Sequence, residues 1–343
     1  MNNLYKFKLT SFKDPQVARC WKEMETGRMS PYLHRDYMEY IASYTSRYTF
    51  YRPRVACVTD GVGNILMMVP LKGSLTLSYF KMLGDIQGCD RTDALYHPSL
   101  SEQEKEEATR YFYSEMRCKL KLHRLQEGSP MVGAAPRERM VSESTNPYVR
   151  IAVPADHEEH LKTLSPSVRQ NLRTAYNRMR RDGKEFTAEM LGGDRPVSDA
   201  VWKEIMDLYF TRLFSKYKKA KATNPVSRLR WRIIYYRLKH DTLSLKKLPN
   251  ARHILLRDAS GRLVAFMSGF LTNDGGSLTI PRLAIDSEFR FYSPGYILLD
   301  QALRLLEKEG TVAELDMSRG DEKYKFDMGG TPYITTDLKF RSI

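Results

Sequence analysis

The chain has 343 residues, of which 42% are hydrophobic and 28% are charged, and this balance excludes a protein that is disordered over most of its length. No apolar run approaches the roughly 20 residues that a membrane-spanning helix needs, and no signal-peptide core opens the chain, so we expect a cytoplasmic protein. The formal net charge of +14 indicates an anionic partner or surface, such as nucleic acid, a phosphate ligand, an acidic glycan or lipid head groups.

The first predicted elements are a helix, a hairpin and a second helix. Tyrosines between residues 37 and 48 fall near one face of the first helix, where core packing is favoured over stacking on a sugar. A β-hairpin with a short polar turn is predicted at 55–71, "VACVTDGVGNILMMVPL". A charged amphipathic helix follows from about residue 101 to residue 120.

Neither the cysteines nor the histidines predict a metal site. The four cysteines are widely spaced, which predicts reduced and mostly buried thiols. His157 and His160 lie close together near a predicted helix start, where two solvated side chains are favoured over metal ligands. We therefore expect no bound metal.

The middle of the chain, from residue 164 to residue 240, is predicted to be helical and basic. The stretch "LSPSVRQNLRTAYNRMRRDGKEF" has the marks of one helix, with Ser165 as its cap, Pro166 in its first turn and Gly183 at its end. Between residues 212 and 240 there are ten Lys or Arg and no acidic residue. Because like charges repel each other, we favour a functional basic field here over a solvated face.

The C-terminal part alternates clearly between strands and helices, which predicts an α/β fold: a mixed sheet with helices on its faces. The predicted strands lie at 252–257, 262–272, 277–285, 312–317 and 333–340, and the predicted helices at 295–308 and 321–327.

Two hairpins in the chain resemble each other. Residues 253–269, "HILLRDASGRLVAFMSG", repeat the pattern of the N-terminal hairpin: a short apolar strand, Asp, a turn with Gly and a second apolar strand. Asp60 corresponds to Asp258 and Gly63 to Gly261 at one constant offset. A duplicated α/β unit explains this pattern, and a chance likeness between two common hairpins is the alternative.

The stretch "RFYSPGYILLD" lies where a predicted strand leads into a helix. A helix N-terminus exposes unpaired N–H groups and binds phosphate readily. Gly295 lets a ligand approach the backbone, Pro294 directs the chain, and Ser293 adds a hydroxyl donor. Arg290 brings a full positive charge to the same place. A diphosphate suits this stretch, and a simple turn before a helix is the alternative.

In its context this stretch resembles the pyrophosphate-binding pattern of the GNAT acyltransferase superfamily: Gln or Arg, two residues, Gly, any residue, Gly or Ala. Arg290 and Gly295 match the pattern, and Ser293 stands where the first glycine is usual. Downstream, "AELDMSRGDEKYKFDMGG" resembles the signature of one branch, the CelD-type acetyltransferase-like proteins of polysaccharide and cellulose biosynthesis. The matching positions are Ser293, Pro294, Gly295, Asp316, Gly320, Asp321, Glu322, Tyr324 and Lys325.

The CelD-type branch is related to the FemAB peptidyltransferases, which contain two GNAT-like units in tandem. The resemblance therefore implies a mixed-sheet α/β fold with two such units. The N-terminal unit is expected at 1–150 without a CoA motif. The C-terminal unit is expected at 151–343, with the basic helical segment at 164–240 and the single acyl-CoA site.

The resemblance also implies a mechanism, in which an acyl group passes directly from acyl-CoA, most simply acetyl-CoA, to an amine without a covalent acyl-enzyme. It assigns the CoA diphosphate to Arg290, Ser293, Pro294, Gly295 and Tyr296. A main-chain N–H near Leu283 or Ala284 would polarise the thioester, and Tyr324 would protonate the departing thiolate. The candidates for a general base are Asp316, Asp321 and Glu322, and those for substrate binding are Arg169, Arg173, Asp321 and Lys325.

The favoured function is therefore an acyl-CoA-dependent acyltransferase that acts on an anionic glycan or nucleotide-sugar precursor in polysaccharide or cell-envelope biosynthesis. A FemAB-like peptidyltransferase that uses aminoacyl-tRNA is the first alternative, because a basic segment suits tRNA. A non-catalytic GNAT-like binding protein is the second. Peripheral association with a membrane is compatible with each of them.

Overall fold

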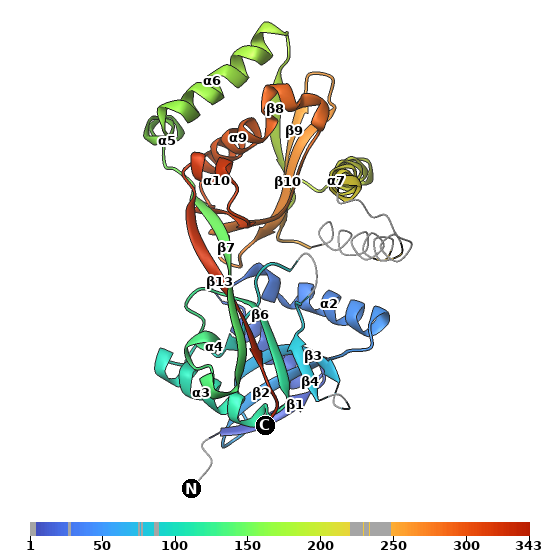
Figure 1. Cartoon of the computed structure of the whole chain (residues 1–343), viewed down its shortest axis with the longest axis vertical. Helices are drawn as coiled ribbons and strands as arrows, with labels where there is room; N and C mark the ends of the chain where they lie inside the picture. Colours follow the sequence, from blue (N-terminus) through green and yellow to red (C-terminus); the bar gives the residue numbers. More distant parts are fainter. Residues whose placement is uncertain are drawn as a thin grey trace. The chain divides into compact units, whose positions relative to one another are not determined.

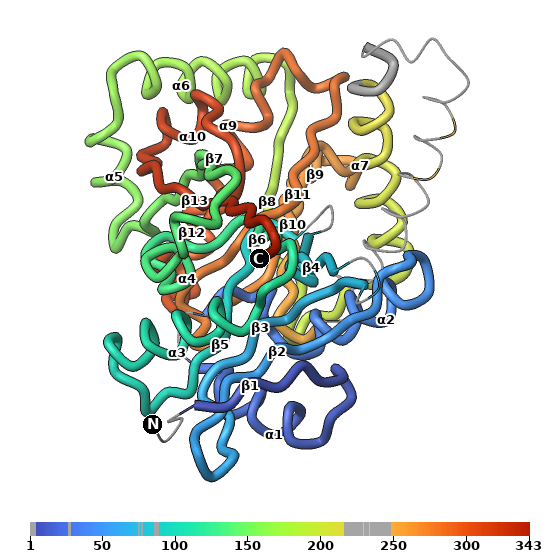
Figure 2. Tube along the Cα trace, turned by 60° about the horizontal axis from the view of Figure 1, so that its bottom comes forward, coloured from blue at the N-terminus to red at the C-terminus, as the bar shows by residue number. Residues whose placement is uncertain are grey.

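The structure is a computed structural model that describes residues 5–26, 29–74, 76, 78–85, 89–219, 229, 233 and 248–343. Apart from its first residues and positions 229 and 233, the basic run predicted at 212–240 lies outside the described residues. The chain forms two compact units (Figures 1 and 2). Unit 1 comprises Met1–Tyr148 and Tyr333–Ile343, and unit 2 comprises Val149–Pro332.

Unit 1 is a sheet with helices on it. Its strands follow the order β1-β2-β3-β4-β6-β13, and β5 pairs with β3. The β4–β6 pair is parallel, whereas the other pairs in this order are antiparallel. The strands are β1 (Tyr5–Thr10), β2 (Arg52–Asp60), β3 (Ile65–Ser74), β4 (Tyr79–Met82), β5 (Leu95–Tyr96), β6 (Lys119–Leu125), β7 (Met140–Ala152) and β13 (Thr331–Phe340). The helices are α1 (Pro15–Met24), η1 (Pro31–Leu33), α2 (Arg35–Tyr48), α3 (Glu102–Glu115), α4 (Pro130–Gly133) and η2 (Arg137–Arg139).

In unit 2 the strands follow the order β12-β11-β10-β9-β8. Only the β11–β12 pair of this order is parallel. Its strands are β8 (Phe186–Leu191), β9 (Ala251–Asp258), β10 (Leu263–Leu271), β11 (Ser277–Ile285) and β12 (Glu314–Arg319). Its helices are α5 (His157–Thr163), α6 (Pro166–Arg181), α7 (Asp199–Lys219), η3 (Ser287–Tyr292), α9 (Pro294–Glu309) and α10 (Lys323–Asp327).

Helices cover both faces of the unit 2 sheet. The alternate strand residues Ile254, Leu256 and Met267 pack into one core with α6 and α9. His253, the residue before Ile254, points to the other face, where its ring lies 5.5 Å from that of Trp202 in α7. α6 and α7 accordingly lie on opposite sides of strands β8 to β10 (Figures 1 and 2). The predicted α/β fold with mixed sheets is confirmed.

The two similar hairpins have the same turn. In β2–β3 the Asp60 carboxylate accepts hydrogen bonds from the main-chain N–H groups of Val62 and Asn64, at 3.0 and 2.8 Å. In β9–β10 the Asp258 carboxylate accepts them from the residues at the same offsets, at 2.9 and 3.0 Å. The glycine of each turn has a positive φ, 98° at Gly63 and 83° at Gly261, which side chains rarely adopt. The likeness between the hairpins therefore extends to their hydrogen bonds.

Most predicted elements of the C-terminal part occur within two or three residues of their expected bounds, and β11 has the predicted range. The helix predicted to reach residue 120 is shorter, because α3 ends at Glu115 and Lys119 already begins β6. Ser165 caps α6 as expected, by accepting a hydrogen bond from the N–H of Val168. The N-terminal tyrosines lie on α2, where Tyr37 and Tyr44 are buried, as core packing predicts.

The domain boundaries in the structure differ from those expected at 150 and at the end of the chain. Unit 1 ends its first segment at Tyr148 and then regains the last residues of the chain, from Tyr333 onward. The cause is β13, whose residues 336–340 pair with β6. Among the described residues, no helix is both long enough and apolar enough to cross a membrane.

Candidate active site

A cavity of about 560 Å³ in unit 2 brings together most of the residues predicted to handle acyl-CoA. Its walls come from α7, the end of β11, η3, the first turn of α9 and the start of α10. The predicted residues that line it are Leu283, Arg290, Ser293, Pro294, Gly295, Tyr296, Glu322 and Tyr324. They come from two stretches of sequence that the fold places on one cavity.

The cavity lies where two parallel strands separate. β11 pairs with β12 only over Ser277–Thr279, which face Glu314–Asp316. Farther along β11, residues 282–285 pair with β10 but not with β12. Among the described residues, one edge of β11 therefore has no strand neighbour in the part that leads to Leu283, which lines the cavity. Edge N–H and C=O groups of this kind are available to a ligand.

The first turn of α9 meets the cavity with an unpaired amide. Ser293 ends η3 and begins α9 with φ 51° and ψ 50°, a left-handed conformation, and its hydroxyl makes no capping hydrogen bond. The amides of Ser293 and Tyr296 are used, since they donate to the carbonyls of Arg290 and Ser293. None of the described residues accepts a hydrogen bond from the Gly295 amide. Such free N–H groups at a helix start attract anions.

The position of Gly295 has little room for a side chain. A Cβ atom at this position would lie 2.9 Å from Cδ1 of Ile285, closer than real Cβ contacts. Both residues line the cavity. Glycine therefore lets the first turn of α9 pack against the end of β11. The exposed Arg290 lines the same cavity and makes no ion pair with any described residue.

Basic residues of α6 hold the loop before α9. Arg178 donates a hydrogen bond to the carbonyl of Phe291 at 3.0 Å, and its guanidinium carbon lies 4.6 Å from the centre of that ring. The Tyr292 hydroxyl donates to the Asp182 carboxylate at 3.0 Å. These contacts give part of the basic helix a structural role. The predicted substrate ligands Arg169 and Arg173 are exposed on α6 and do not line the cavity.

A buried network anchors α9 from the other side. Asp300 accepts hydrogen bonds from Tyr176 at 2.5 Å and, at 2.8 Å, shares one with Nε2 of His157. His157 is 1% exposed, so the prediction of two solvated histidines is wrong for this residue. The cause is Asp300, an acidic residue inside α9 that needs buried partners. His160 is half-buried, and burial together with the charge of His157 lowers its pKa.

Tyr324 lines the cavity and carries a hydroxyl group. Burial and then the charge of Glu322 raise the pKa of Tyr324 to about 12, and the charge of Arg212 opposes this shift. No described residue forms a hydrogen bond with this hydroxyl. In contrast, the Tyr296 hydroxyl donates to Asp327 at 2.6 Å and is not free. With this pKa, Tyr324 is protonated at neutral pH.

Glu322 is held as an ionised carboxylate. Burial acts to raise the pKa of Glu322, but the hydrogen bond and charge of Lys325 outweigh it and lower the pKa. Lys325 itself is buried, away from the cavity lining, and donates to the carbonyls of Met317, Arg319 and Gly320. A lowered pKa makes Glu322 a weak base.

The other predicted residues lie away from the cavity lining. Asp316 is fully buried in β12 and accepts a hydrogen bond from the Ser318 N–H at 2.8 Å. Ala284 is fully buried in β11, and Asp321 is exposed before α10. The described residues contain no group of His, Cys, Asp and Glu arranged to hold a metal ion.

Sequence reasoning missed the contribution of α7. Thr211, Arg212 and Ser215 from this helix line the cavity. The charge of Arg212 lowers the pKa of both Glu322 and Tyr324, which places a cation close to them. The available signal was that Arg212 begins the long basic run. What the pattern does not reveal is that α7 packs on β11, next to the end of that strand.

The comparisons with known proteins agree with this geometry. Residues 166–326 match the family model described as an acetyltransferase (GNAT) domain. This range begins with α6 and ends within α10, so it includes all the elements that line the cavity. A comparison with curated protein sequences found no match.

Solved structures resemble the chain over almost its whole length. FemX has a TM-score of 0.56 and 10% identity, with 98% of this chain and 97% of FemX covered. L-PGS from Bacillus licheniformis has a TM-score of 0.54 and 12% identity, with 97% and 93% covered. The C-terminal domain of a protein assigned as a lysylphosphatidylglycerol synthetase from Agrobacterium fabrum has a TM-score of 0.55 and 11% identity, with 94% and 91% covered. At these identities the likeness is one of fold.

The fold and the site define the class as an α/β protein built from two GNAT-like units in tandem. Its residues 166–326 are similar to an acetyltransferase (GNAT) domain. The CelD-type branch stays a prediction from the signature residues.

Proposed function

We propose that the protein is an acyltransferase that uses acyl-CoA, with its donor site in the cavity of unit 2. One observation carries this proposal: a helix N-terminus with a free amide and a tyrosine with a free hydroxyl line one cavity beside a separated pair of parallel strands. Acyl transfer needs an anion cradle, a group that polarises a carbonyl and a proton donor. These three groups are present on the described elements.

The residues of the cavity suit the diphosphate of CoA. The Gly295 amide is free, and the lack of a Cβ allows close approach of a phosphate to the main chain. Arg290 supplies a charge that no acidic residue of the described chain neutralises, and the Ser293 hydroxyl is free of a capping bond. The main-chain N–H of Tyr296 already donates to the Ser293 carbonyl. Tyr296 would therefore contact the diphosphate through its ring and not through its N–H.

Bound acyl-CoA supplies the acyl group as an activated thioester. The unpaired edge of β11 near Leu283 offers main-chain donors for the thioester oxygen. Tyr324 keeps its proton at the phenol oxygen through neutral pH, because its pKa is about 12, and can deliver it to the departing sulfur. Arg212 adds a positive charge beside Tyr324. No covalent acyl-enzyme is needed in this scheme.

The acceptor that we propose is an anionic glycan or nucleotide-sugar precursor in polysaccharide or cell-envelope biosynthesis, acylated on an amine. Its support is the resemblance of the segment around "RGDEKYK" to the CelD-type branch, together with the net charge of +14. We propose a cytoplasmic location for this reaction.

Calorimetric titration with acetyl-CoA at low and high salt tests the donor site. We expect micromolar binding that changes little with salt, because a cradle of main-chain groups is less screened than exposed charges. Gly295→Glu should abolish binding, since a carboxylate would occupy the cradle. Gly295→Ala is the matched control: its Cβ meets only the flexible end of Ile285, so the fold and part of the affinity should remain. Full binding by Gly295→Glu would place the donor elsewhere.

A second candidate is favoured by one observation, the likeness in fold to FemX over 98% of this chain. In this alternative the protein is a FemAB-like peptidyltransferase that uses aminoacyl-tRNA. Titration with tRNA in the same two buffers separates the candidates, because binding of tRNA should weaken steeply as salt rises. Salt-sensitive binding of tRNA with no heat from acetyl-CoA would support this alternative. Absence of both would favour a non-catalytic GNAT-like protein.

A further inference from the structure

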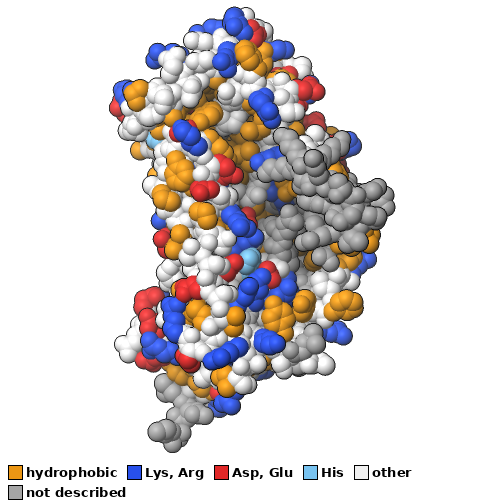
Figure 3. Space-filling view, viewed as in Figure 1, with side chains coloured by type: hydrophobic (Ala, Val, Ile, Leu, Met, Phe, Trp, Pro, Cys, Tyr) orange, Lys and Arg blue, Asp and Glu red, His pale blue; other side chains and the backbone are white. Residues whose placement is uncertain are grey.

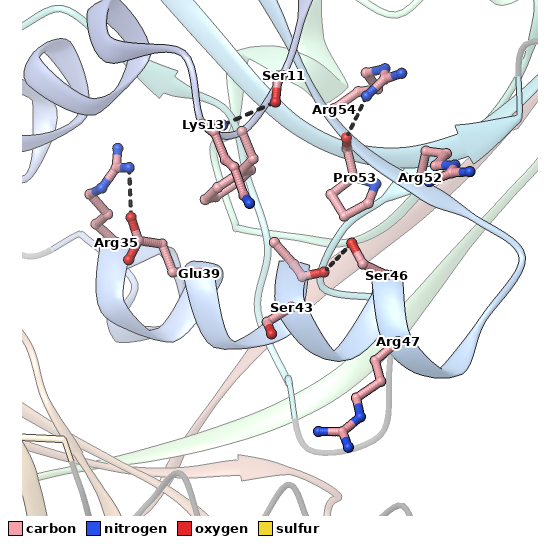
Figure 4. A pocket seen from close by; sticks show the side chains of 12 residues that line it. Ser11, Lys13, Arg35, Glu39, Ser43, Ser46, Arg47, Arg52, Pro53 and Arg54 are labelled. Carbon is pink, nitrogen blue, oxygen red and sulfur yellow. Dashed lines mark hydrogen bonds and ion pairs between the residues drawn. The ribbon is translucent and has the colours of Figure 1, made fainter.

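Unit 1 contains a second cavity, of about 790 Å³, to which acyl transfer assigns no role (Figure 4). Its walls are the loop after β1, one side of α2 and the start of β2. The volume falls within the range of small-molecule pockets. Five of its twelve lining residues are basic and one is acidic. This composition gives the cavity a strong positive field.

The α2 wall is built by one helical stripe. Arg35, Glu39, Ala42, Ser43 and Ser46 are spaced so that they share one face of the helix, and all of them line the cavity. Small side chains occupy the middle of the stripe, which leaves room between α2 and the loop after β1. The ammonium of Lys13 extends from that loop into this space (Figure 4). The cavity is therefore open in its centre and basic around it.

Arg35 is the buried cation of this cavity. Its Nη2 lies 2.6 Å from Oε1 of Glu39, and its side chain is only 13% exposed. Its other terminal nitrogen, Nη1, is buried and has no hydrogen-bond partner in the part of the chain that the structure describes. A buried guanidinium N–H without an acceptor is costly, and an anionic oxygen in the cavity would satisfy it.

The remaining cations are not neutralised by acidic neighbours. Lys13 and Arg52 line the cavity and make no ion pair with any described residue. Arg54 donates only to the carbonyl of Pro53, at 3.3 Å. Folding has thus gathered like charges around one cavity, and this arrangement is repulsive unless a ligand offsets it.

A hydrophobic side chain lies close by in the chain. Phe50, in the turn between α2 and β2, is fully exposed, with a relative exposure of 103%. Arg47 and Arg52, which both line the cavity, flank this turn in sequence. Figure 3 shows hydrophobic and basic side chains next to each other on the face of unit 1 that carries α2. An exposed aromatic beside arginines suits the interface of an anionic membrane.

We propose that the cavity of unit 1 is a binding site for the phosphate group of a ligand. Arg35 provides the buried donor, Lys13 and Arg52 provide the flanking charges, and Ser43 provides a hydroxyl. The phosphate belongs either to a soluble phosphate ester or to a lipid head group, and Phe50 distinguishes these two sources. This site depends only on unit 1 and stands independently of the acyltransferase proposal.

Calorimetry with inorganic pyrophosphate tests the site in the full-length protein. The double variant Lys13→Ala/Arg52→Ala should weaken binding about tenfold or more, the loss expected for charge-assisted hydrogen bonds. Its matched control is Lys22→Ala/Lys119→Ala, which removes two exposed charges of unit 1 outside the cavity lining and should change binding less than twofold. The series is repeated with Arg290→Ala, which removes one of the two arginines that line the unit 2 cavity among the described residues.

Sedimentation with vesicles identifies the source of the phosphate. Phosphatidylcholine vesicles are compared with and without phosphatidylglycerol, for the wild type and for Phe50→Ala. Binding that requires phosphatidylglycerol, Phe50 and the two cations supports a lipid head group. Binding of pyrophosphate without vesicle binding supports a soluble ester.

Three results would overturn the proposal. The first is an equal loss of pyrophosphate binding in the cavity variant and its charge-matched control. The second is loss of all pyrophosphate binding in Arg290→Ala alone. The third is binding of single-stranded RNA that pyrophosphate does not compete with and that needs Lys13 and Arg52. Thermal melting of each variant excludes unfolding as the cause.

Discussion

Lys325 and Glu322 form an ion pair in which Nζ lies 2.9 Å from Oε2, although the lysine side chain is 3% exposed and that of the glutamate 56%. The same ammonium donates to three main-chain carbonyls at the end of β12. It therefore ties the first turn of α10 to that strand. Because Tyr324 lies between the paired residues, this contact also sets the place of its ring on the cavity.

Removal of the Lys325 ammonium should lower the stability of unit 2. Lys325→Met leaves three carbonyls with no donor, so we expect the free energy of unfolding to fall by about 2–4 kcal/mol. Lys323→Met is the matched control, because Lys323 is 83% exposed and pairs with Asp327 on the surface; its loss should cost about 0.5 kcal/mol or less. Urea denaturation of both variants gives the comparison. Equal stability of the two would show that the buried contacts of Lys325 contribute nothing net.

Tyr324→Phe should separate chemistry from binding. The hydroxyl has no hydrogen-bond partner among the described residues, so the variant should fold and melt like the wild type. If Tyr324 gives up its proton during transfer, kcat should fall by about 10²- to 10⁴-fold while acetyl-CoA binding stays within about twofold. Steady-state kinetics and calorimetry measure the two quantities. Unchanged kcat would mean that the leaving group takes its proton from elsewhere.

Ser293 stores backbone strain at the start of α9. Its φ of 51° is left-handed, which costs an ordinary side chain about 1–2 kcal/mol. Ser293→Gly removes this strain at a smaller entropic cost, so unfolding should become harder by about 0.5–1 kcal/mol. Ser287→Gly changes a position without a positive φ, so its free energy of unfolding should instead fall by a similar amount. Chemical denaturation measures the free energy of unfolding of both variants. A decrease in both variants would contradict backbone strain at Ser293.

His253 should make unit 2 sensitive to acid. Burial first, and then the charges of Arg282 and Arg252, lower the pKa of His253 to about 4. The unfolded chain binds this proton near pH 6.5, so between about 6.5 and 4 it holds more protons than the folded chain. The stabilisation is complete above pH 6.5 and is lost as the pH falls through this window, by about 3 kcal/mol. In denaturation measured across pH, His253→Gln should make the free energy of unfolding depend less steeply on pH between about 4 and 6.5. An unchanged dependence would refute this role of His253.

Local sequence signals predicted the C-terminal elements well. β11 and α9 are bounded by residues whose chemistry marks those bounds, such as Pro294 at the start of the helix and Gly310 after its end. α3 was predicted too long because apolar residues near position 120 continue a helical pattern. Pairing of Leu120 with Phe80 and Phe340 turns this stretch into a strand. Such long-range pairing is not visible in local periodicity.

The site was predictable only in part, because a signature does not say what each of its residues does. Gly320 has a φ of 107°, and Lys325 and Asp316 are buried among main-chain groups. These three positions shape the end of β12 and carry α10, whereas Tyr324 and Glu322 reach the cavity. The cavity of unit 1 gave no motif at all, because its basic residues come from separate elements that only folding brings together.

The return of the last strand to unit 1 has a consequence for how the protein is made. Residues 336–340 of β13 complete a sheet whose other strands are among the first to be synthesised, and unit 2 is encoded entirely between them. During translation, the sheet of unit 1 keeps an open edge at β6 until residues 336–340 emerge, while unit 2 can already fold. A truncated product that stops after residue 332 would expose β6 as an unpaired edge, a template for aggregation. Protection of the β6 edge thereby depends on a segment that is made only after the whole of unit 2.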